Sequence, residues 1–318
     1  MITMTEIARL THVSQPTVSR VLNGSQTVAP EIRERVLACA REHHYQPNAL
    51  ARGLQGGRTR LLALLVPDVS DSFSAVLARV AEEEARRRGC GVILLNTGRQ
   101  GESGPACLET ARRYRADGAL AVSPGGSAPA LPDGGLDLPV VAVNWRAAGL
   151  DSVYVDQREA GAMVACHLAE RGYGRFLFVG GADEAKCAGF LQALAGRGLG
   201  GRTDCVPDGD GLQATLDTQF RRHSARTGLF AANDALALRV LSILRELGVP
   251  TPRRAGVVGF GDDCMGRYLS PRLSSVAQPV ERMAQQAVER LLYRVEHPEG
   301  EGVLDLVLPA ELTVRESA

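Results

Sequence analysis

The segment 13–25, VSQPTVSRVLNGS, sets polar side chains beside an apolar helical stripe. The residues outside the stripe are Gln15, Pro16, Thr17 and Arg20. A glutamine can hydrogen-bond a base edge with both amide atoms, an arginine can fork onto a guanine, and a threonine or proline can touch a thymine methyl group. Gln15, Pro16 and Thr17 are consecutive, and Arg20 follows about one helical turn later. These residue types have the chemistry needed to read DNA bases.

Two short capped helices would present this polar face. Thr3 and Glu6 have the spacing of a capping box at the start of a first helix. Ser14 can cap a second helix, which ends near Asn23-Gly24. The turn between them, 11–13, completes a helix-turn-helix, whose second helix lies in the DNA major groove. A plain helical hairpin with a solvated polar face fits the same pattern, so the pattern alone leaves both interpretations open.

Two further helical segments follow. Pro30 suits the first turn of a third helix over 31–45, whose apolar face holds Ile32, Val36, Leu37 and Ala40. Asn48 can cap a very short fourth helix, ALARGL (49–54), before a glycine-containing linker over 55–60. Residues 1–60 hold eight Arg and four Glu (+4), whereas the remainder holds 28 basic and 32 acidic residues (−4). A basic end on an acidic body favours contact with a polyanion.

From residue 61 the pattern changes to strand-length apolar runs alternating with amphipathic helical segments. The predicted strands cover 61–67, 91–97, 118–124, 139–144, 152–156, 175–181, 227–234 and 255–261. Runs that are apolar throughout indicate strands buried on both faces of a parallel sheet. The length favours two α/β lobes with a cleft between them over a single doubly wound sheet. Glycine- and proline-rich stretches, 124–139 and 196–211, are interpreted as surface loops.

Composition limits the other functions. Seven scattered cysteines without a C-x-x-C pair indicate reduced packing residues, and the six histidines lack metal-ligand spacing, so neither a metal nor a cofactor is expected. We find no G-x-S-x-G, H-E-x-x-H, Walker or G-x-G-x-x-G motif, so we do not expect an enzyme. The start MITMTEIARLTH lacks signal-peptide features, and we expect a cytoplasmic protein without a membrane span.

The chain closely resembles the lactose-repressor (LacI/GalR) family of bacterial transcription regulators. The matching elements are VSxxTVSRVLNG, the third-helix pattern V-x-x-E-x-R-x-R-V, the hinge pattern Y-x-P-N-x-x-A-R-x-L and the strand ending VPDVS. Later segments also fit: DGALAVSP, VYVD, FAANDALAL, VVGFGD, LSPRLSSVAQP and LPAELTVRES. The resemblance covers essentially the whole chain. It implies an all-α DNA-binding headpiece joined to an α/β body of two doubly wound lobes like those of periplasmic binding proteins.

The resemblance assigns roles at the DNA end. Gln15, Pro16 and Arg20 occupy the base-reading positions, and Thr17 belongs with them by its chemistry. Ser14, Thr17, Ser19 and Asn23 match residues that touch phosphates, which position a protein without reading sequence. In the hinge, Leu54 matches a leucine that wedges into the minor groove, with Asn48, Ala51 and Arg52 beside it. So short a hinge helix would be stable only when two copies meet on DNA. The alternative to the minor-groove wedge is that Leu54 is an ordinary apolar residue that packs onto the body.

The resemblance also implies an effector site at strand ends between the lobes. Matching positions are Asp71, Phe73, Asp156, Asn233, Asp234 and Asp262. Two positions depart from the family: Glu184 stands near the point where an arginine is usual, and Gly261 replaces the first aspartate of GFDD. Trp145 and Arg146 could supply a stacking face and a cation from the other lobe. The effector can be a sugar or a sugar acid, and a weak or absent response to any small molecule also remains open. Each of these cleft residues can alternatively be an ordinary polar group at the end of a strand.

These features together predict a regulator, with repression as the expected direction, that binds a pseudo-palindromic operator as a homodimer. We expect a headpiece over 1–46, a hinge over 47–60, and a body over 61–318. Within the body, one lobe takes about 61–156 and 280–297, and the other about 157–279 and 298–318. No leucine heptad follows the body, so no tetramer is expected. A sugar-binding protein with the same body but no role at DNA is the alternative; it would have no use for residues 1–60.

Overall fold

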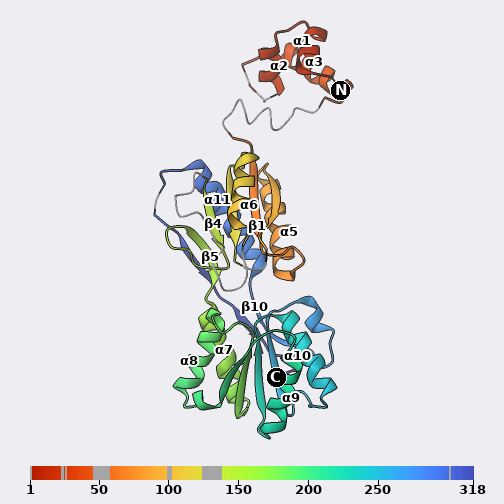
Figure 1. Ribbon diagram of the computed structural model, residues 1–318. Coiled ribbons are helices and arrows are strands. Elements are labelled where there is room, and N and C mark those ends of the chain that lie inside the picture. The colour runs from red at the N-terminus through yellow and green to blue at the C-terminus, as the bar shows by residue number, and fades with distance from the viewer. Residues whose placement is uncertain are drawn as a thin grey trace. The chain divides into compact units, whose positions relative to one another are not determined.

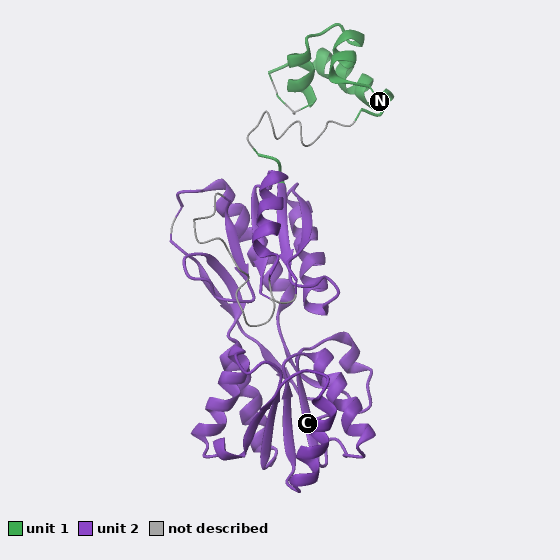
Figure 2. Cartoon of the chain, viewed as in Figure 1, with its two compact units in different colours: residues 1–60 green, residues 61–318 purple. Residues whose placement is uncertain are grey.

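The computed structural model describes residues 2–22, 25, 27–45, 58–98, 102–123, 138–300 and 302–318. The chain forms two compact units, residues 1–60 and residues 61–318 (Figure 2). Each unit has its own hydrophobic core, and each is described here by itself. Among the described residues, no helix is long and apolar enough to cross a membrane.

The described residues of the first unit form the helices α1 (Met4–Leu10), α2 (Gln15–Leu22) and α3 (Pro30–Glu42). Their core is built from Ile7, Val18, Val21, Val36 and Ala40, with smaller contributions from neighbours. The predicted capping box is present, since Thr3 accepts a hydrogen bond from the Glu6 N–H and the Glu6 carboxylate accepts one from the Thr3 N–H. The helix-turn-helix prediction is confirmed, although α3 ends three residues earlier than expected.

The first sheet of the body has the order β11-β5-β4-β3-β1-β2, and all its pairings are parallel (Figure 1). Its strands are β1 (Leu61–Val66), β2 (Gly91–Asn96), β3 (Gly118–Val122), β4 (Val140–Val143), β5 (Asp151–Val155) and β11 (Asp305–Leu308). Helices α5 (Ser72–Arg87) and α11 (Val280–Glu296) pack against each other. Helix α6 (Gly104–Arg113) packs on β1 and β2.

Strand β1 shows why its run of apolar residues does not alternate with polar ones. Leu62, Leu64 and Val66 join the core that contains α5 and α11, whereas Ala63 and Leu65 join a second core with α6. Successive side chains of a strand point to opposite faces, so a strand covered on both faces must be apolar throughout.

The second sheet has the order β12-β10-β9-β8-β6-β7, and only β12 runs antiparallel. Its strands are β6 (Arg175–Val179), β7 (Thr203–Val206), β8 (Thr227–Ala231), β9 (Ala255–Gly261), β10 (Ser274–Ala277) and β12 (Glu311–Thr313). Figure 1 shows α7 (Gln157–Glu170) and α8 (Ala185–Gly196) on one side, with α9 (Leu212–Arg222) and α10 (Asp234–Glu246) on the other. Two 3-10 turns, Gly200–Arg202 and Cys264–Arg267, complete this lobe. The prediction of two α/β lobes is confirmed.

Two expectations from the sequence are wrong. Residues 298–318 were placed in the second lobe, but β11 pairs with β5 in the first sheet, and only β12 joins the second. The stretch 196–211 was interpreted as a loop, but it contains β7, which pairs with β6. Both strands are short edge strands with partly exposed side chains, so neither has the apolar run that marks a buried strand.

Candidate DNA-binding face and effector site

Helix α2 is held by its apolar side, which leaves its polar side exposed. Val18 and Val21 are buried in the core of the first unit. At the start of the helix, Ser14 Oγ accepts a hydrogen bond from the Thr17 N–H at 3.3 Å and lies 2.8 Å from Thr17 Oγ1. The predicted base-reading residues Gln15, Pro16 and Arg20 are exposed as a consequence, while Thr17 and Ser19 are half-buried.

The turn before α2 is fixed by buried hydrogen bonds. Thr11 Oγ1 donates to the Ile7 carbonyl at 2.6 Å, and the Val13 N–H donates to the Ala8 carbonyl at 3.0 Å. His12 adopts a left-handed backbone with φ of 53°, a conformation that glycine reaches without steric cost. A glycine or an asparagine would adopt this backbone conformation at lower cost than the histidine.

The start of α3 lacks a side-chain cap. Ala29 occupies the N-cap position and Pro30 the first turn, so no side-chain oxygen accepts from the exposed helical N–H groups. Arg33 Nη2 donates to the Ser25 carbonyl at 2.6 Å and ties the preceding loop to the helix. The remaining predicted DNA contacts, Asn23, Asn48, Ala51, Arg52 and Leu54, lie outside the described residues and stay predictions, as does the fourth helix.

In the body, the connections between the lobes place the carboxyl ends of the two sheets opposite each other. The chain leaves the first sheet after β5 and enters α7, and it leaves the second sheet after β10 and enters α11. A third segment joins the end of β11 to β12, whose first residue pairs with the last residue of β10. Residues that follow strands on both sheets therefore border the space between the lobes, where α/β proteins bind ligands.

In the first lobe, the predicted residues have mostly local partners. Asp71 caps α5 by accepting from the Ser74 N–H at 3.1 Å, and Phe73 packs against the core. Asp156, at the end of the first lobe's β5, caps α7 by accepting from the Arg158 and Glu159 N–H groups. The Trp145 indole N–H donates to the Ala121 carbonyl at 3.1 Å. All these positions follow carboxyl ends of strands, as expected.

Arg146 does not join this group. Its guanidinium pairs at 2.5 Å with Asp305, the first residue of β11. The amino end of β11 is the end away from the other lobe, because the crossing segment leaves from its carboxyl end. The side chain is 71% exposed. The expectation that Arg146 supplies a cation to the effector site therefore does not match its position.

In the second lobe, Glu184 is bound to a buried lysine. Glu184 Oε2 lies 2.9 Å from Lys186 Nζ, and its Oε1 accepts from the Gly181 N–H at 2.9 Å. Lys186 is 4% exposed, with Nζ 4.6 Å from the centre of the Phe260 ring. Lys186 is three residues before Gly189-Phe190, so a cation is present near the point where the family arginine was thought lost. The sequence analysis missed it, although it is the only lysine in the chain.

Two aspartates lie at the ends of β8 and β9. Asp234 is buried and accepts from Ser275 Oγ and from the Asp263 N–H, both at 2.6 Å. Burial raises the pKa of Asp234, although these two hydrogen bonds act to lower it. Asp262 pairs with Arg315 at 2.6 Å and with Arg267 at 3.2 Å. Beside Asp234, Asn233 caps α10 by accepting from the Leu236 N–H at 2.8 Å.

Gly261 has a structural reason to be glycine. Its φ is 131°, in a region that side chains rarely adopt, and it directly precedes Asp262, whose own φ is 52°. An aspartate at position 261 would be strained in this backbone. Asp234, Asp262 and Asp263 supply the carboxylates that follow β8 and β9 at this edge of the sheet.

An amide cluster at the crossing segments was also missed by the sequence analysis. Gln278, just after β10, donates from Nε2 to Asn144 Oδ1 at 2.9 Å, and Gln157 donates to the Asn144 carbonyl at 3.4 Å. Asn144 follows β4 in a left-handed conformation with φ of 67°. These bonds join segments of both lobes. The sequence feature that could have indicated this cluster is the family segment VAQP (276–279), which contains Gln278.

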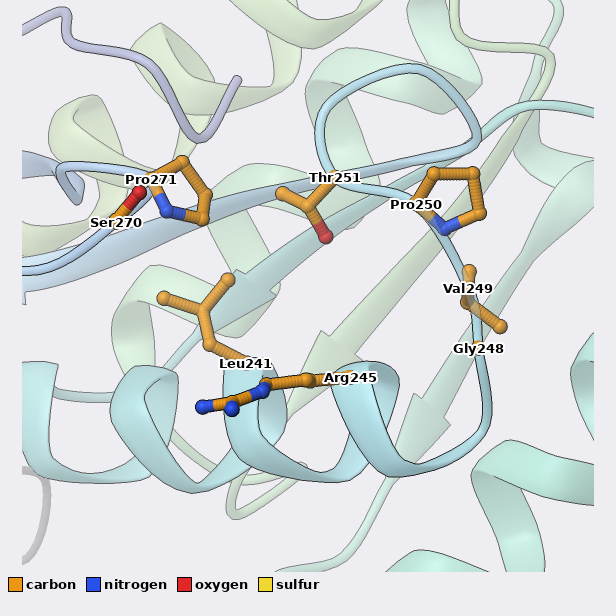
Figure 3. Close-up of a pocket in the computed structure, with 8 residues that line it drawn as sticks. All are labelled: Leu241, Arg245, Gly248, Val249, Pro250, Thr251, Ser270 and Pro271. Atoms are coloured by element: carbon orange, nitrogen blue, oxygen red, sulfur yellow. The ribbon is translucent and has the colours of Figure 1, made fainter.

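A separate pocket lies on the outer part of the second lobe, where two loops pass over the end of α10 (Figure 3). Its lining residues are Leu241, Arg245, Gly248, Val249, Pro250, Thr251, Ser270 and Pro271. None of the predicted effector residues lines this pocket, so it is distinct from the strand-end site. Within the described ranges, no group of three metal-binding side chains comes together.

Comparison with known proteins identifies both units. Residues 3–48 match the family "Bacterial regulatory proteins, lacI family", and residues 165–318 match the "Periplasmic binding protein-like domain". The ribose operon repressor of Haemophilus influenzae is 28% identical and aligns over 100% of this chain and 98% of its own length. The transcriptional repressor PurR of Vibrio cholerae is 29% identical over 95% of this chain and 94% of its own length. The chain therefore carries a lacI-family DNA-binding domain at its N-terminal end and a periplasmic-binding-protein-like domain in its C-terminal half.

Solved structures of similar proteins agree. The transcriptional regulator CelR in complex with cellobiose is 27% identical, has a TM-score of 0.70 and covers 100% of both chains. The lac repressor dimer bound to operator shares the fold, with a TM-score of 0.86 at 21% identity, over 99% of this chain and 98% of that one. Together with the family matches and the repressors among its relatives, this makes the chain a DNA-binding transcription regulator rather than an enzyme.

Proposed function

We propose that this lacI-family protein represses transcription as a homodimer on a pseudo-palindromic operator, under the control of a small neutral polyhydroxylated ligand, such as a sugar, bound between the lobes. The observation that carries the DNA part is the exposed polar face of α2, held outward by the buried Val18 and Val21. A regulator of this kind acts on the chromosome, which places it in the cytoplasm.

Charge pairing at the strand-end site supports a neutral ligand. Lys186 is bound to Glu184, while Arg267 and Arg315 are bound to Asp262. Arg146, the cation that a sugar acid would need from the first lobe, is bound to Asp305. A carboxylate or phosphate ligand would have to break one of these ion pairs, whereas hydroxyl groups can bind to paired carboxylates and amides without doing so. Cellobiose, the ligand in the solved CelR complex, is of this neutral class, and so is ribose, after which the operon of the Haemophilus influenzae relative is named.

Exposed apolar residues support pairing of two copies through the body. Tyr268 is 82% exposed and Met265 is 55% exposed, both in or beside the 3-10 turn that follows β9. In the first lobe, the edge strand β2 has one open side and carries the exposed Leu94. Exposed apolar side chains such as these favour association where a second copy covers them. Two bodies joined in this way would present two headpieces to two half-sites.

Regulation follows from differential binding. A ligand that prefers one arrangement of the two lobes shifts the population toward that arrangement, and it changes DNA affinity by the difference in its affinity for the two states. The same scaffold serves an inducer or a corepressor. The sign of the effect is a result of the experiment below.

The first test is selection of bound sequences from a random double-stranded DNA library at physiological salt. The full chain is compared with the body alone, residues 61–318, which has its own core. We expect a two-fold symmetric consensus with the full chain and none with the body. Equal enrichment by both would contradict DNA recognition by α2, and no enrichment with either would favour the sugar-binding alternative.

A second test assigns individual contacts on the selected DNA. Replacing Arg20 with alanine should weaken binding by about 1–3 kcal/mol, concentrated at one base pair of each half-site. A uniform loss on all sequences would instead make Arg20 a phosphate contact. Replacing Leu54 with alanine should weaken operator binding without unfolding the headpiece, and unchanged affinity would reject the minor-groove wedge.

A further inference from the structure

Two thiols meet across α8 and β7 in the second lobe. Cys187 Sγ lies 3.3 Å from Cys205 Sγ. Cys187 is in the first turn of α8, and Cys205 is on β7, the edge strand of the second sheet. Both cysteines are free. A disulfide has a sulfur–sulfur distance of about 2.05 Å, so bond formation would require the two sulfurs to approach by about 1.2 Å.

The two cysteines differ in their access to solvent. Cys187 is completely buried against the core, whereas Cys205 is half-buried at the sheet edge. Burial and the neighbouring Cys205 thiol raise the pKa of Cys187 to about 12. Cys187 therefore carries almost no thiolate at neutral pH and is unsuited to react first with a dissolved oxidant. Cys205 is the thiol that an oxidant reaches.

We propose that Cys187 and Cys205 form a reversible disulfide on oxidation by a hydroperoxide, and that this bond is a second input to the effector-binding lobe. In the first step, the Cys205 sulfur attacks hydrogen peroxide, the O–O bond breaks, and sulfenic acid and water form. In the second step, the Cys187 sulfur displaces hydroxide from the sulfenic sulfur, and the hydroxide leaves as water with the Cys187 proton. Two thiols and one peroxide thus give one disulfide and two waters. A dithiol reductant reverses the change.

The position of Cys187 connects this bond to the effector site. Cys187 directly follows Lys186, and Glu184, the ion-pair partner of Lys186, occupies the N-cap position of the same helix. Helix α8 is packed closely on α7, because Gly189 faces the Arg158 backbone and Gly161 faces the Lys186 backbone. A bond that draws the first turn of α8 toward β7 therefore moves the Glu184–Lys186 pair relative to Phe260. This consequence rests on the proposed function, since it assumes that the strand-end site binds the effector.

The test uses the full chain carrying Cys264→Ser, which removes the exposed thiol that would otherwise join two chains. The protein is treated with hydrogen peroxide, and peptides are mapped by mass spectrometry without reduction. We expect a peptide pair linking positions 187 and 205 that has lost two hydrogens and is restored by dithiothreitol. Added Cys205→Ser should abolish the link. Added Cys166→Ser, at a half-buried cysteine on α7, should leave it intact.

Thermal unfolding gives a second measurement that does not depend on folding of a variant. Oxidation closes a loop between residues 18 apart in the chain, so the melting temperature of the body should rise by roughly 5 °C and return on reduction. Oxidation of Cys205 to sulfinic acid without a link, a different cysteine pair, or no reaction with peroxide would each overturn the proposal.

Ligand binding separates this proposal from the proposed function. The dissociation constants of ribose and cellobiose are measured for the reduced and the oxidised protein, and we expect at least a twofold difference for the sugar that binds. If the disulfide forms and the affinity for the sugar does not change, the proposed effect on the effector-binding lobe is wrong, whereas the disulfide itself is confirmed. Absence of sugar binding by the reduced protein would contradict the proposed ligand class, while the mass of the linked peptides would still decide the disulfide.

Discussion

At the scale of single residues, Asp151 holds together three segments of the first lobe. Its buried carboxylate accepts hydrogen bonds from Arg290 and Arg294 on α11 and from the Leu304 N–H at 2.6 Å. Burial alone would raise the pKa of Asp151, but the hydrogen bonds from Arg294, Arg290 and Leu304 and the charge of Arg290 outweigh it. The pKa is consequently far below its usual value. Asp151 thus fixes α11 and the 300–304 segment at the start of β5.

Replacing Asp151 with asparagine should lower the free energy of unfolding by roughly 2–4 kcal/mol at neutral pH, because two half-buried guanidinium groups lose their partner. Since the pKa is lowered in the folded state, this stabilisation is present above the unfolded pKa of about 4 and is lost as the pH falls below it. Urea titrations of both proteins from pH 7 to pH 3 measure the difference. It should shrink toward pH 3, and a difference that does not change with pH would contradict the assignment.

At the scale of elements, the contact between α7 and α8 depends on two glycines. A Cβ atom at Gly189 would overlap the Arg158 carbonyl, and one at Gly161 would overlap the Lys186 carbonyl. These positions allow the helix backbones to touch, and they set the position of the first turn of α8 with Glu184 and Lys186. A side chain larger than hydrogen would force the helices apart.

Gly189→Ala should therefore destabilise the body by roughly 2–3 kcal/mol. Gly196→Ala, at the end of the same helix, meets no atom within 4 Å and should stabilise it by about 0.5 kcal/mol through reduced freedom of the unfolded chain. Denaturant unfolding of the two variants gives the comparison. Equal effects would mean that helix propensity, and not the helix contact, governs Gly189.

The elements also show what the sequence can predict. Strands such as β1 and β8 are buried on both faces, so their apolar runs were sufficient to predict them. The edge strands β7, β11 and β12 are only partly buried and have no such run. Strand-end polar residues such as Asp71 and Asn233 were predicted from the family resemblance, which places them after strands of the two lobes. The partners of Glu184 and Arg146 were not, because the first depends on a packed Phe260 and the second on a strand more than 150 residues away.

At the scale of the whole body, the crossing segments must carry any coupling between the lobes. Gln278 is buried and links its segment to Asn144, which follows β4 of the first sheet. This amide pair ties the segment between β10 and α11, which crosses between the lobes, to the loop after β4 in the first lobe. Residues that bias such a two-state element alter coupling without touching either ligand, by about 0.5–2 kcal/mol.

Gln278→Ala should therefore weaken the effect of the sugar ligand on operator affinity by about 2–30-fold, while the sugar still binds and the DNA site is still recognised. The reason is that the strand-end site and α2 keep their own contacts, and only the bond between this crossing segment and the loop after β4 is lost. Operator affinity is measured with and without saturating sugar. Gln286→Ala, at an exposed glutamine on α11, serves as the matched control and should keep full coupling. If Gln278→Ala couples the two sites as well as the control does, the lobes communicate through other contacts of the crossing segments.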